Sequence, residues 1–311
     1  DGAGFKMDAL ESLIQGLAAS DVELGFDGNL YFADYGGGWS ANRNGTVQVL
    51  RPTDSEALRN GAETARMFKK GFSERSNTEL SSLLESLDRR IRQEAQFALV
   101  ANGKNALPIL KEHLIAEKFK VSSLHAVWAL GQLTRKGDKD ASDLLLSALG
   151  SPHAEIRANA ARTLGDLGIF EARELLLSKL ADRSSRVRSL SAIALGRISE
   201  TGDQAVQDAL FEAVAENTGT DFEVTLRHAY LSALDRICDP EILSSFTTSE
   251  SLEQRMMAVL LLRRFEHEDL SLFLSDSDEQ IQHEAIRAVY DTKALTSSAG
   301  SKLLDIGLKD L

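Results

Sequence analysis

The chain has 311 residues, of which 43% are hydrophobic and 26% charged, a composition typical of a globular protein. Its formal net charge of −12 argues against nucleic acid and anionic lipid as partners, unless basic residues gather on one face. No apolar run reaches the roughly 18 residues that cross a bilayer, so we expect no membrane span.

The first fifty residues predict a small antiparallel β element. Apolar and polar side chains alternate over 22–26 and again over 30–35, and the Asp27-Gly28 dipeptide between them is a hairpin turn signal. A third alternating segment covers 46–50, so the three strands look like one blade of a β-propeller. Three strands with one apolar face need a packing partner, and within this chain only the first helices can supply it.

Two segments around this element are less regular. Apolar residues at positions 7, 10, 14 and 17 have helical spacing, but in an intact propeller part of the same stretch would be a strand, so both alternatives stay open. Residues 53–78 predict a polar, linking helix with breaks at Asn60-Gly61 and Gly71. We expect the repeated part of the chain to begin near Glu79.

Seven windows of ten residues then resemble one another. Their starts lie between 27 (254 to 281) and 39 (187 to 226) residues apart, and a period of this size is typical of stacked helix pairs. The windows cover residues 91–100, 122–131, 156–165, 187–196, 226–235, 254–263 and 281–290.

The windows agree position by position at two columns. The fifth and ninth residues are four apart, so they share one helix face and should form the buried spine of the repeats. The fifth residues, mostly small, are Ala95, Ala126, Ala160, Ser191, Tyr230, Ala258 and Ala285. The ninth residues, all aliphatic, are Leu99, Leu130, Leu164, Leu195, Leu234, Leu262 and Val289.

Arginine occupies the second position in five windows. Each such Arg can lay its stem on the core with its head in water, or pair with an acid in the preceding turn, such as Asp88 or Asp182. A ladder of arginines that binds an anion is the alternative, which the net charge disfavours. We interpret the cluster of Arg89, Arg90 and Arg92 as a solvated helix end. The second-position residues are Arg92, Arg157, Arg188, Arg227 and Arg255.

Second amphipathic segments lie between the windows, at 106–116, 141–150, 172–181 and 205–214. The unit is therefore helix, turn, helix, turn, and the predicted fold is mainly α. We expect a right-handed α-solenoid of about seven HEAT-like helix pairs, preceded by the small N-terminal antiparallel β element. The predicted organisation is a blade-like fragment over 1–52, a helical linker over 53–78 and the solenoid over 79–311.

Two strings, residues 16–39 and 71–100, give the chain a family resemblance. In this order they resemble the junction in large multidomain dehydrogenase-like proteins of the planctomycete and verrucomicrobial type. In those proteins a propeller similar to quinone-dependent sugar dehydrogenases precedes HEAT-like repeats, and often a c-type cytochrome domain follows. The resemblance implies an exported, periplasmic relative. This chain holds only a last blade and no CxxCH, so no catalytic, quinone, calcium or haem residue is carried over.

Few residues qualify as candidate site residues. Asp34, in the second strand, is the blade residue to watch, although in such blades an Asp here usually ties a turn together. His283-Glu284 is similar to the His-Glu pairs that hold two irons in deoxyhypusine hydroxylase, but it is one full pair in seven windows, and a di-iron site needs several. The single cysteine, Cys238, is expected to be a buried structural thiol. We therefore predict no catalytic residue, no cofactor and no metal in this chain.

The leading hypothesis is a non-catalytic scaffold. Its concave face, lined by the second helices of the pairs, would hold a protein partner or a neighbouring domain, with no nucleic acid and no membrane span. The alternative hypothesis is the C-terminal portion of a propeller-type quinone-dependent sugar or alcohol dehydrogenase whose catalytic blades are missing from this chain.

Overall fold

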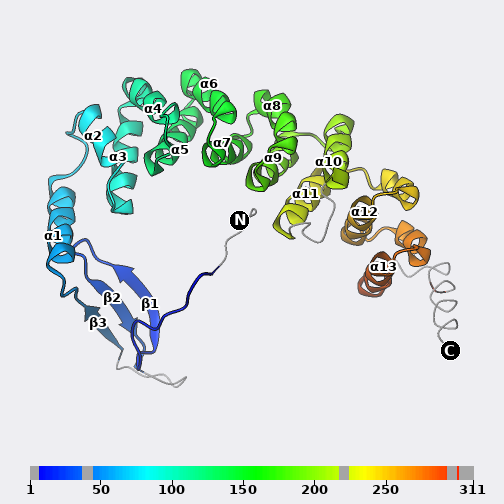
Figure 1. The fold of residues 1–311 in the computed structure, drawn as a ribbon, viewed down its shortest axis with the longest axis horizontal. Helices are drawn as coiled ribbons and strands as arrows, with labels where there is room; N and C mark the ends of the chain where they lie inside the picture. The colour runs from blue at the N-terminus through cyan, green and yellow to red at the C-terminus, as the bar shows by residue number, and fades with distance from the viewer. Residues whose placement is uncertain (1–6, 37–44, 217–223, 293–299, 301–311) are drawn as a thin grey trace. The chain divides into compact units, whose positions relative to one another are not determined.

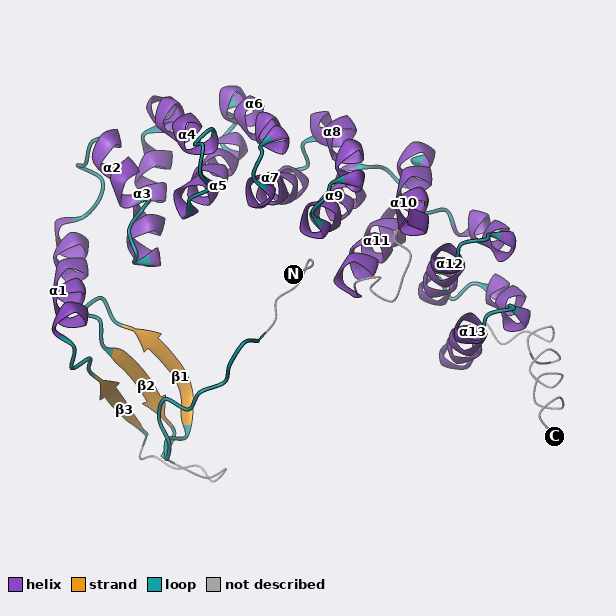
Figure 2. Cartoon of the chain, in the orientation of Figure 1, coloured by secondary structure: helices purple, strands orange, loops and turns teal. Residues whose placement is uncertain are grey.

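The computed structural model describes residues 7–36, 45–216, 224–292 and 300. It divides into an N-terminal unit, residues 6–142, and a C-terminal unit that begins at residue 143. The N-terminal unit holds a three-stranded sheet followed by helices, and the C-terminal unit is built from helices in its described part (Figures 1 and 2). Each unit is described by itself.

The sheet is antiparallel with strand order β1-β2-β3, as predicted. The strands are β1 Ala19–Leu24, β2 Leu30–Asp34 and β3 Thr46–Leu50. Register places Val22, Phe32 and Gln48 side by side, with Leu24, Leu30 and Leu50 next to them on the same face. Of these side chains Phe32 is the buried one, whereas Val22 stays 52% exposed. The segment over 7–17 forms neither helix nor strand and its apolar side chains are largely exposed, so nothing stabilises a short helix there.

The hairpin turn packs on helix α1, Ser55–Lys70. The Phe26 ring lies 4.1 Å from the Phe68 ring, and Arg90 donates a hydrogen bond of 2.5 Å from Nη1 to the Leu24 carbonyl. The predicted break at Asn60-Gly61 is wrong, because α1 runs through it. Gly61 is needed for contact instead: a Cβ there would lie 2.3 Å from the Asp27 carbonyl oxygen. As predicted, the helix ends at Gly71, which adopts φ 80°.

The rest of the N-terminal unit consists of short helices stacked along the chain. The first begins two residues before Glu79, with a capping box between Ser76 and Glu79. The helices are α2 Asn77–Leu83, α3 Arg89–Ala101, η1 Gly103–Ala106, α4 Leu107–Leu114, α5 Val121–Arg135 and α6 Lys139–Ser147, which spans the boundary between the units.

In the C-terminal unit, α7, α9 and α11 lie side by side, with α8 packed on α9 (Figure 1). Two second segments of the repeats are 3-10 helices, η5 and η6, rather than α-helices. The longer elements are α7 Ala154–Leu167, α8 Arg173–Ser178, α9 Ser185–Ile198, α10 Gln204–Glu216, α11 Val224–Ile237, η5 Pro240–Thr248, α12 Leu252–Arg264, η6 Glu268–Ser275 and α13 Glu279–Asp291. Short 3-10 turns complete the pairs at η2 Ala148–Gly150, η3 Phe170–Ala172 and η4 Lys179–Ala181.

The two predicted columns are confirmed. All seven windows are helical, and every fifth-position and ninth-position residue named above has 0% exposed surface. Burying a Leu side chain stabilises the fold by about 1.5–3 kcal/mol, so the ninth column is a main source of the stability of each unit.

Glycines let neighbouring window helices approach closely. A Cβ built on Gly165 of α7 would lie 2.6 Å from the Cα of Ala194 on α9. Gly196 of α9 makes the same kind of contact with Ala233 of α11, where a Cβ would lie 2.6 Å from the Ala233 Cα. Only a residue without a side chain fits at these two crossings.

Candidate functional site

The window arginines brace the turns that precede their own helices. In four windows the Nη1 group donates to the backbone carbonyl six residues earlier in the chain. The pairs are Arg92 to Ser86 at 2.6 Å, Arg157 to Ser151 at 2.8 Å, Arg188 to Asp182 at 2.8 Å and Arg255 to Ser249 at 2.7 Å. The predicted partner in the preceding turn is thus a carbonyl and not a carboxylate. Asp88 in particular binds Arg90 instead, at 2.7 Å.

Two of these arginines also hold a carboxylate from the next repeat. Arg157 donates from Nε and Nη2 to the two carboxylate oxygens of Asp182, both at 2.7 Å, and each side chain of this pair is 7% exposed. Arg255 binds Asp276 through the same two groups, at 2.9 and 3.3 Å. We call this arrangement the Arg-Asp ladder. Bidentate Arg-carboxylate pairs of this kind are strong and geometrically specific.

The repeat of α3 and α5 departs from the ladder. Arg92 donates from Nε to His125 Nε2, at 3.2 Å, where the other two arginines hold a carboxylate. No carboxylate among the described residues pairs with Arg92. Glu117 lies five residues before its window, as Asp182 and Asp276 do, but it is exposed and makes no ion pair in the described part of the chain.

His125 is held as a neutral acceptor by these contacts. Its Nε2 accepts from Arg92, so Nδ1 carries the proton and donates to Gln96 Oε1 at 2.8 Å. Burial, and then the positive charge of Arg92, lower the pKa of His125 to about 4. The imidazole also meets the Trp128 ring edge-on at 5.0 Å. These contacts fix the ring at the base of a pocket.

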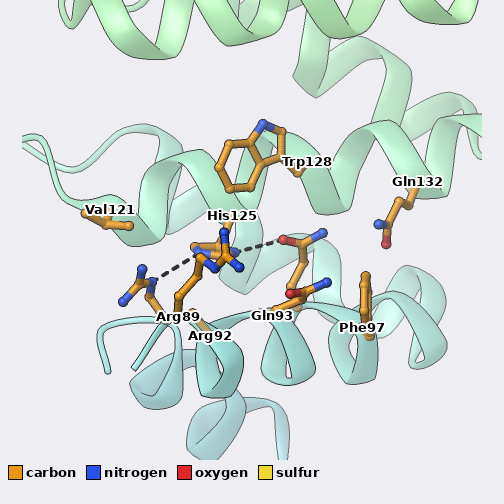
Figure 3. Close-up of a pocket in the computed structure, with 9 residues that line it drawn as sticks. Arg89, Arg92, Gln93, Phe97, Val121, His125, Trp128 and Gln132 are labelled. Carbon is orange, nitrogen blue, oxygen red and sulfur yellow. Dashed lines mark hydrogen bonds between the residues drawn. The ribbon is translucent and has the colours of Figure 1, made fainter. Parts of the chain in front are cut away.

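The pocket lies between α3 and α5 and has a volume of about 540 Å³ (Figure 3). We call it the α3–α5 pocket. Arg89 extends from α3 toward α5, and Trp128 stands over His125 on the α5 side. Trp128 is 39% exposed and Phe97 41% exposed, which leaves two aromatic surfaces open to a ligand. The lining residues are Arg89, Arg92, Gln93, Gln96, Phe97, Val121, His125, Trp128 and Gln132, and none of them is acidic.

The pocket is lined by other helices than the ones expected to carry a binding surface. We expected the second helices of the pairs to carry it, whereas both helices that line this pocket are window helices. The interpretation of the arginine cluster as solvated is wrong for Arg90 and Arg92, which are both hydrogen-bonded and partly buried. Arg89 alone fits it, since it is exposed.

The residues singled out from sequence lie apart from this pocket. Asp34 ties a turn, because its Oδ1 accepts from the backbone amides of Ala18 at 3.3 Å and Gly36 at 2.9 Å. Glu284 pairs with Arg263 at 2.8 Å, and His283 is exposed on the same helix, α13. Within the described residues, no group of three or more His, Cys, Asp or Glu side chains is placed to hold a metal ion.

Cys238 is buried, as predicted. Burial, and then the charge of Asp239, raise the pKa of the thiol to about 12, so it stays protonated at neutral pH. In the described ranges no helix has the length and apolar character to span a bilayer.

Comparison with known proteins supports the repeat architecture. A family model described as HEAT repeats matches residues 107–177 and 142–222. Together with the stacked helix pairs and the buried columns, this match shows that the helical part of the chain is built from HEAT-like repeats. No match was found among curated proteins.

Several solved structures are similar at low identity. One is the complex of CpcE and CpcF of phycocyanin lyase from Nostoc sp. PCC7120, with 18% identity, a TM-score of 0.38, and 74% of this chain and 93% of that chain covered. Human deoxyhypusine hydroxylase has 17% identity and a TM-score of 0.34, with 74% and 88% covered. A designed armadillo repeat protein in complex with the peptide (KR)4 has 17% identity and a TM-score of 0.38, with 71% and 100% covered.

Proposed function

We propose that this chain is a non-catalytic helical-repeat scaffold that binds a protein partner through the α3–α5 pocket. The observation that carries the proposal is the combination in one pocket of the exposed rings of Trp128 and Phe97 with the exposed cation Arg89. Aromatic side chains and arginine are the residue types enriched where protein interfaces gain most of their binding energy.

The chemistry of the pocket supports binding rather than catalysis. Both ring nitrogens of His125 are engaged, one as acceptor from Arg92 and one as donor to Gln96, so the imidazole has no free nitrogen to act as a base. The only thiol, Cys238, does not line the pocket and is held protonated. The open groups of the pocket are suited to contact a ligand and not to transfer a proton.

Capture of partners from the native cell extract, with the full chain as bait, tests the proposal. Wild type is compared with Trp128→Ala and with Phe170→Ala, a matched control whose ring is 60% exposed on η3, outside the pocket. We expect at least one protein to be recovered by wild type and the control, and about tenfold less of it by Trp128→Ala, since anchoring residues at interfaces contribute on this scale. Recovery of nothing above background would reject the scaffold, and equal recovery by all three would reject the pocket.

A second candidate rests on the sheet. Val22, Leu24 and Leu50 share one face and are 52%, 44% and 37% exposed, so this face supports a covering partner. Such a partner would be a neighbouring propeller domain if this chain is the C-terminal portion of a quinone-dependent sugar or alcohol dehydrogenase. Reading the gene upstream of residue 1 tests this: further propeller blades would support it, and an unrelated sequence would reject it.

A further inference from the structure

The starting point is the pair of donor groups on Arg92. In the two repeats with a closed Arg-Asp ladder, Nε and Nη2 of the window arginine together hold both oxygens of one aspartate. In the α3–α5 repeat, Nε of Arg92 holds the neutral imidazole of His125, and Nη2 has no partner among the described residues. The ladder therefore lacks its carboxylate in this repeat, and a pocket opens beside Arg92.

A second cation lies at the same pocket. Arg89 is exposed one helical turn before Arg92 on α3, and among the described residues it makes neither an ion pair nor a side-chain hydrogen bond. The chain as a whole has a net charge of −12, yet the lining of the pocket holds two arginines and no acid. No carboxylate in the lining offsets the charge of the two guanidinium groups, and neutral His125 adds no third positive charge.

Aromatic side chains beside the two arginines offer an apolar surface to a ligand. Trp128 from α5 and Phe97 from α3 both line the pocket and leave about two-fifths of their surface exposed, 39% and 41%. The amides of Gln93 and Gln132 line it as well and can pair with a peptide backbone, which carries both donors and acceptors. A volume of about 540 Å³ is within the usual range for a ligand pocket.

We propose that the α3–α5 pocket recognises an acidic peptide segment of the partner, in which an Asp or Glu carboxylate binds Arg89 and Nη2 of Arg92 and a neighbouring apolar side chain packs on Trp128 and Phe97. This inference rests on the proposed function, since it names the chemistry of the partner that the scaffold binds. The incoming carboxylate supplies the charge that Asp182 and Asp276 supply to the closed ladders.

A nucleic acid would also bring anions and flat rings, but charge favours the peptide. Binding a nucleic acid backbone requires several phosphates to be neutralised together, whereas this pocket offers two arginines on a chain of net charge −12. A single carboxylate needs no more than the two guanidinium groups that are present.

Selection from a random peptide library displayed on phage tests the proposal, with the full chain immobilised. Wild type is compared with Arg89→Glu and with Arg135→Glu, a matched control that makes the same charge change at an exposed arginine of α5 outside the pocket lining. We expect wild type and the control to enrich peptides with Asp or Glu next to an aromatic or aliphatic residue. Arg89→Glu should lose that preference and enrich Lys or Arg instead, because the sign of the pocket is partly reversed.

Affinity measurements then make the test quantitative. A fluorescent version of the best selected peptide should bind Arg89→Glu about tenfold or more weaker than it binds wild type. The same peptide with its Glu changed to Gln, or its Asp to Asn, should bind wild type weaker than the parent peptide by a similar factor. In both cases a charge-assisted hydrogen bond is lost. Arg135→Glu should bind the parent peptide within about twofold of wild type, because that arginine lies outside the pocket.

The outcomes separate this inference from the proposed function. If wild type enriches peptides without acidic residues and Trp128→Ala abolishes their binding, the carboxylate inference is overturned and the scaffold stands. If no peptide is enriched and the extract yields no partner, the proposed function fails as well. Binding of a short single-stranded oligonucleotide that is lost in Arg89→Glu would overturn the peptide in favour of nucleic acid.

Discussion

The second-position arginine of the window has different partners in two repeats, that of α7 and α9 and that of α3 and α5. In the first, Arg157 braces its own turn and closes on Asp182, and both side chains are buried. In the second, Arg92 makes the same brace but closes on neutral His125 beside an open pocket. The comparison teaches that the same window position forms a buried ion pair where the chain supplies a carboxylate. Beside the α3–α5 pocket it leaves Nη2 of Arg92 without a partner among the described residues.

The two repeats also differ in the residue at the tenth window position. Gly165, the tenth residue of its window, lets α7 contact the backbone of Ala194 on α9 directly. The tenth residue of the first window is Val100, which is buried and has a side chain to accommodate, so α3 cannot make this contact at that position. At this position α7 and α9 pack directly on each other. We therefore expect substitutions there to change the free energy of unfolding more than substitutions at the α3–α5 pocket.

The largest expected effect is on the buried spine. Leu164→Ala and Leu195→Ala each remove a fully buried side chain and should lower the free energy of unfolding by about 2–5 kcal/mol. Urea denaturation followed by circular dichroism measures the loss. The matched control is Leu175→Ala on α8, where the side chain is 43% exposed and the change should be much smaller. Melts of both buried variants that coincide with wild type would contradict the assignment of the ninth column as core.

The closed ladder should matter next. Asp182→Asn removes the charge that Arg157 meets in a nearly dry site, and we expect a loss of about 3 kcal/mol, because a buried guanidinium is left without its counter-ion. Burial is the largest single effect and raises the pKa of Asp182, but the hydrogen bonds from Arg157 and the Ser184 amide, with the charges of Arg157 and Lys179, together hold that pKa below its ordinary value.

The control for the ladder is an exposed pair. Asp140→Asn breaks the 3.4 Å ion pair between Asp140 and Lys104, whose side chains are 65% and 73% exposed, respectively. The free energy of unfolding should change by no more than about 1 kcal/mol. A loss at Asp182 as small as that at Asp140 would show that the ladder does not stabilise the C-terminal unit.

The repeats could be predicted from the sequence because helix packing requires small and aliphatic residues at a fixed spacing, and that spacing is visible in the sequence. The columns through Ala160 and Leu164 follow from a helix period alone, and their burial is confirmed. The hairpin could be predicted from strand alternation and the Asp27-Gly28 turn. The place of Gly61 inside a helix could not, because Gly61 is required there by its contact with the turn at Asp27, which is far away in the sequence.

The candidate site was not predicted, because it depends on which partner each arginine finds. Arg92 and Arg157 occupy the same position in their windows, and nothing in either window shows that one meets His125 and the other Asp182. The signal that was missed lies outside the windows: an aspartate five residues before Val187, Asp182, and again before Ile281, Asp276, marks the closed ladders. The α3–α5 repeat, which holds the pocket, has Glu117 at this position instead.

Close helix packing gives a third way to test the comparison. Gly165→Ala should lower the free energy of unfolding by about 1–3 kcal/mol, since the new methyl group would lie 2.6 Å from the Ala194 Cα and the two helices would have to separate. Gly150→Ala is the matched control, because no atom lies within 4 Å of a Cβ built there. Urea denaturation of both variants decides it: equal stability of the two would mean that α7 and α9 have room to separate freely.

The pH dependence of stability tests the state of His125. Its pKa is lowered from 6.5 to about 4 in the folded chain, so between these values the unfolded chain binds a proton that the folded chain does not. Stability should therefore fall as the pH drops, by about 1–2 kcal/mol between pH 7 and pH 5 from this residue. The measurement compares urea denaturation at the two pH values for wild type and His125→Gln.

His113 makes this comparison necessary. Burial also lowers the pKa of His113, which therefore changes stability in the same direction, but it is present in both proteins and cancels in the difference between them. The carboxylates with lowered pKa values, such as Asp88 and Asp182, become protonated only below this pH range and so do not contribute to the difference. If His125→Gln and wild type lose the same stability between pH 7 and pH 5, the imidazole is not held neutral by Arg92 and Gln96.

The smallest stability effect is expected at the pocket itself, and this is where the two regions should differ most clearly. Arg89→Glu changes an exposed side chain without a partner among the described residues, so the free energy of unfolding should stay within about 0.5 kcal/mol of wild type, as it should for Arg135→Glu. Because Arg89→Glu is also expected to weaken the binding of acidic peptides about tenfold or more, binding and stability would be separated in one variant. A loss of stability as large as that of Asp182→Asn would instead make Arg89 a structural residue, and the pocket a part of the fold rather than a site.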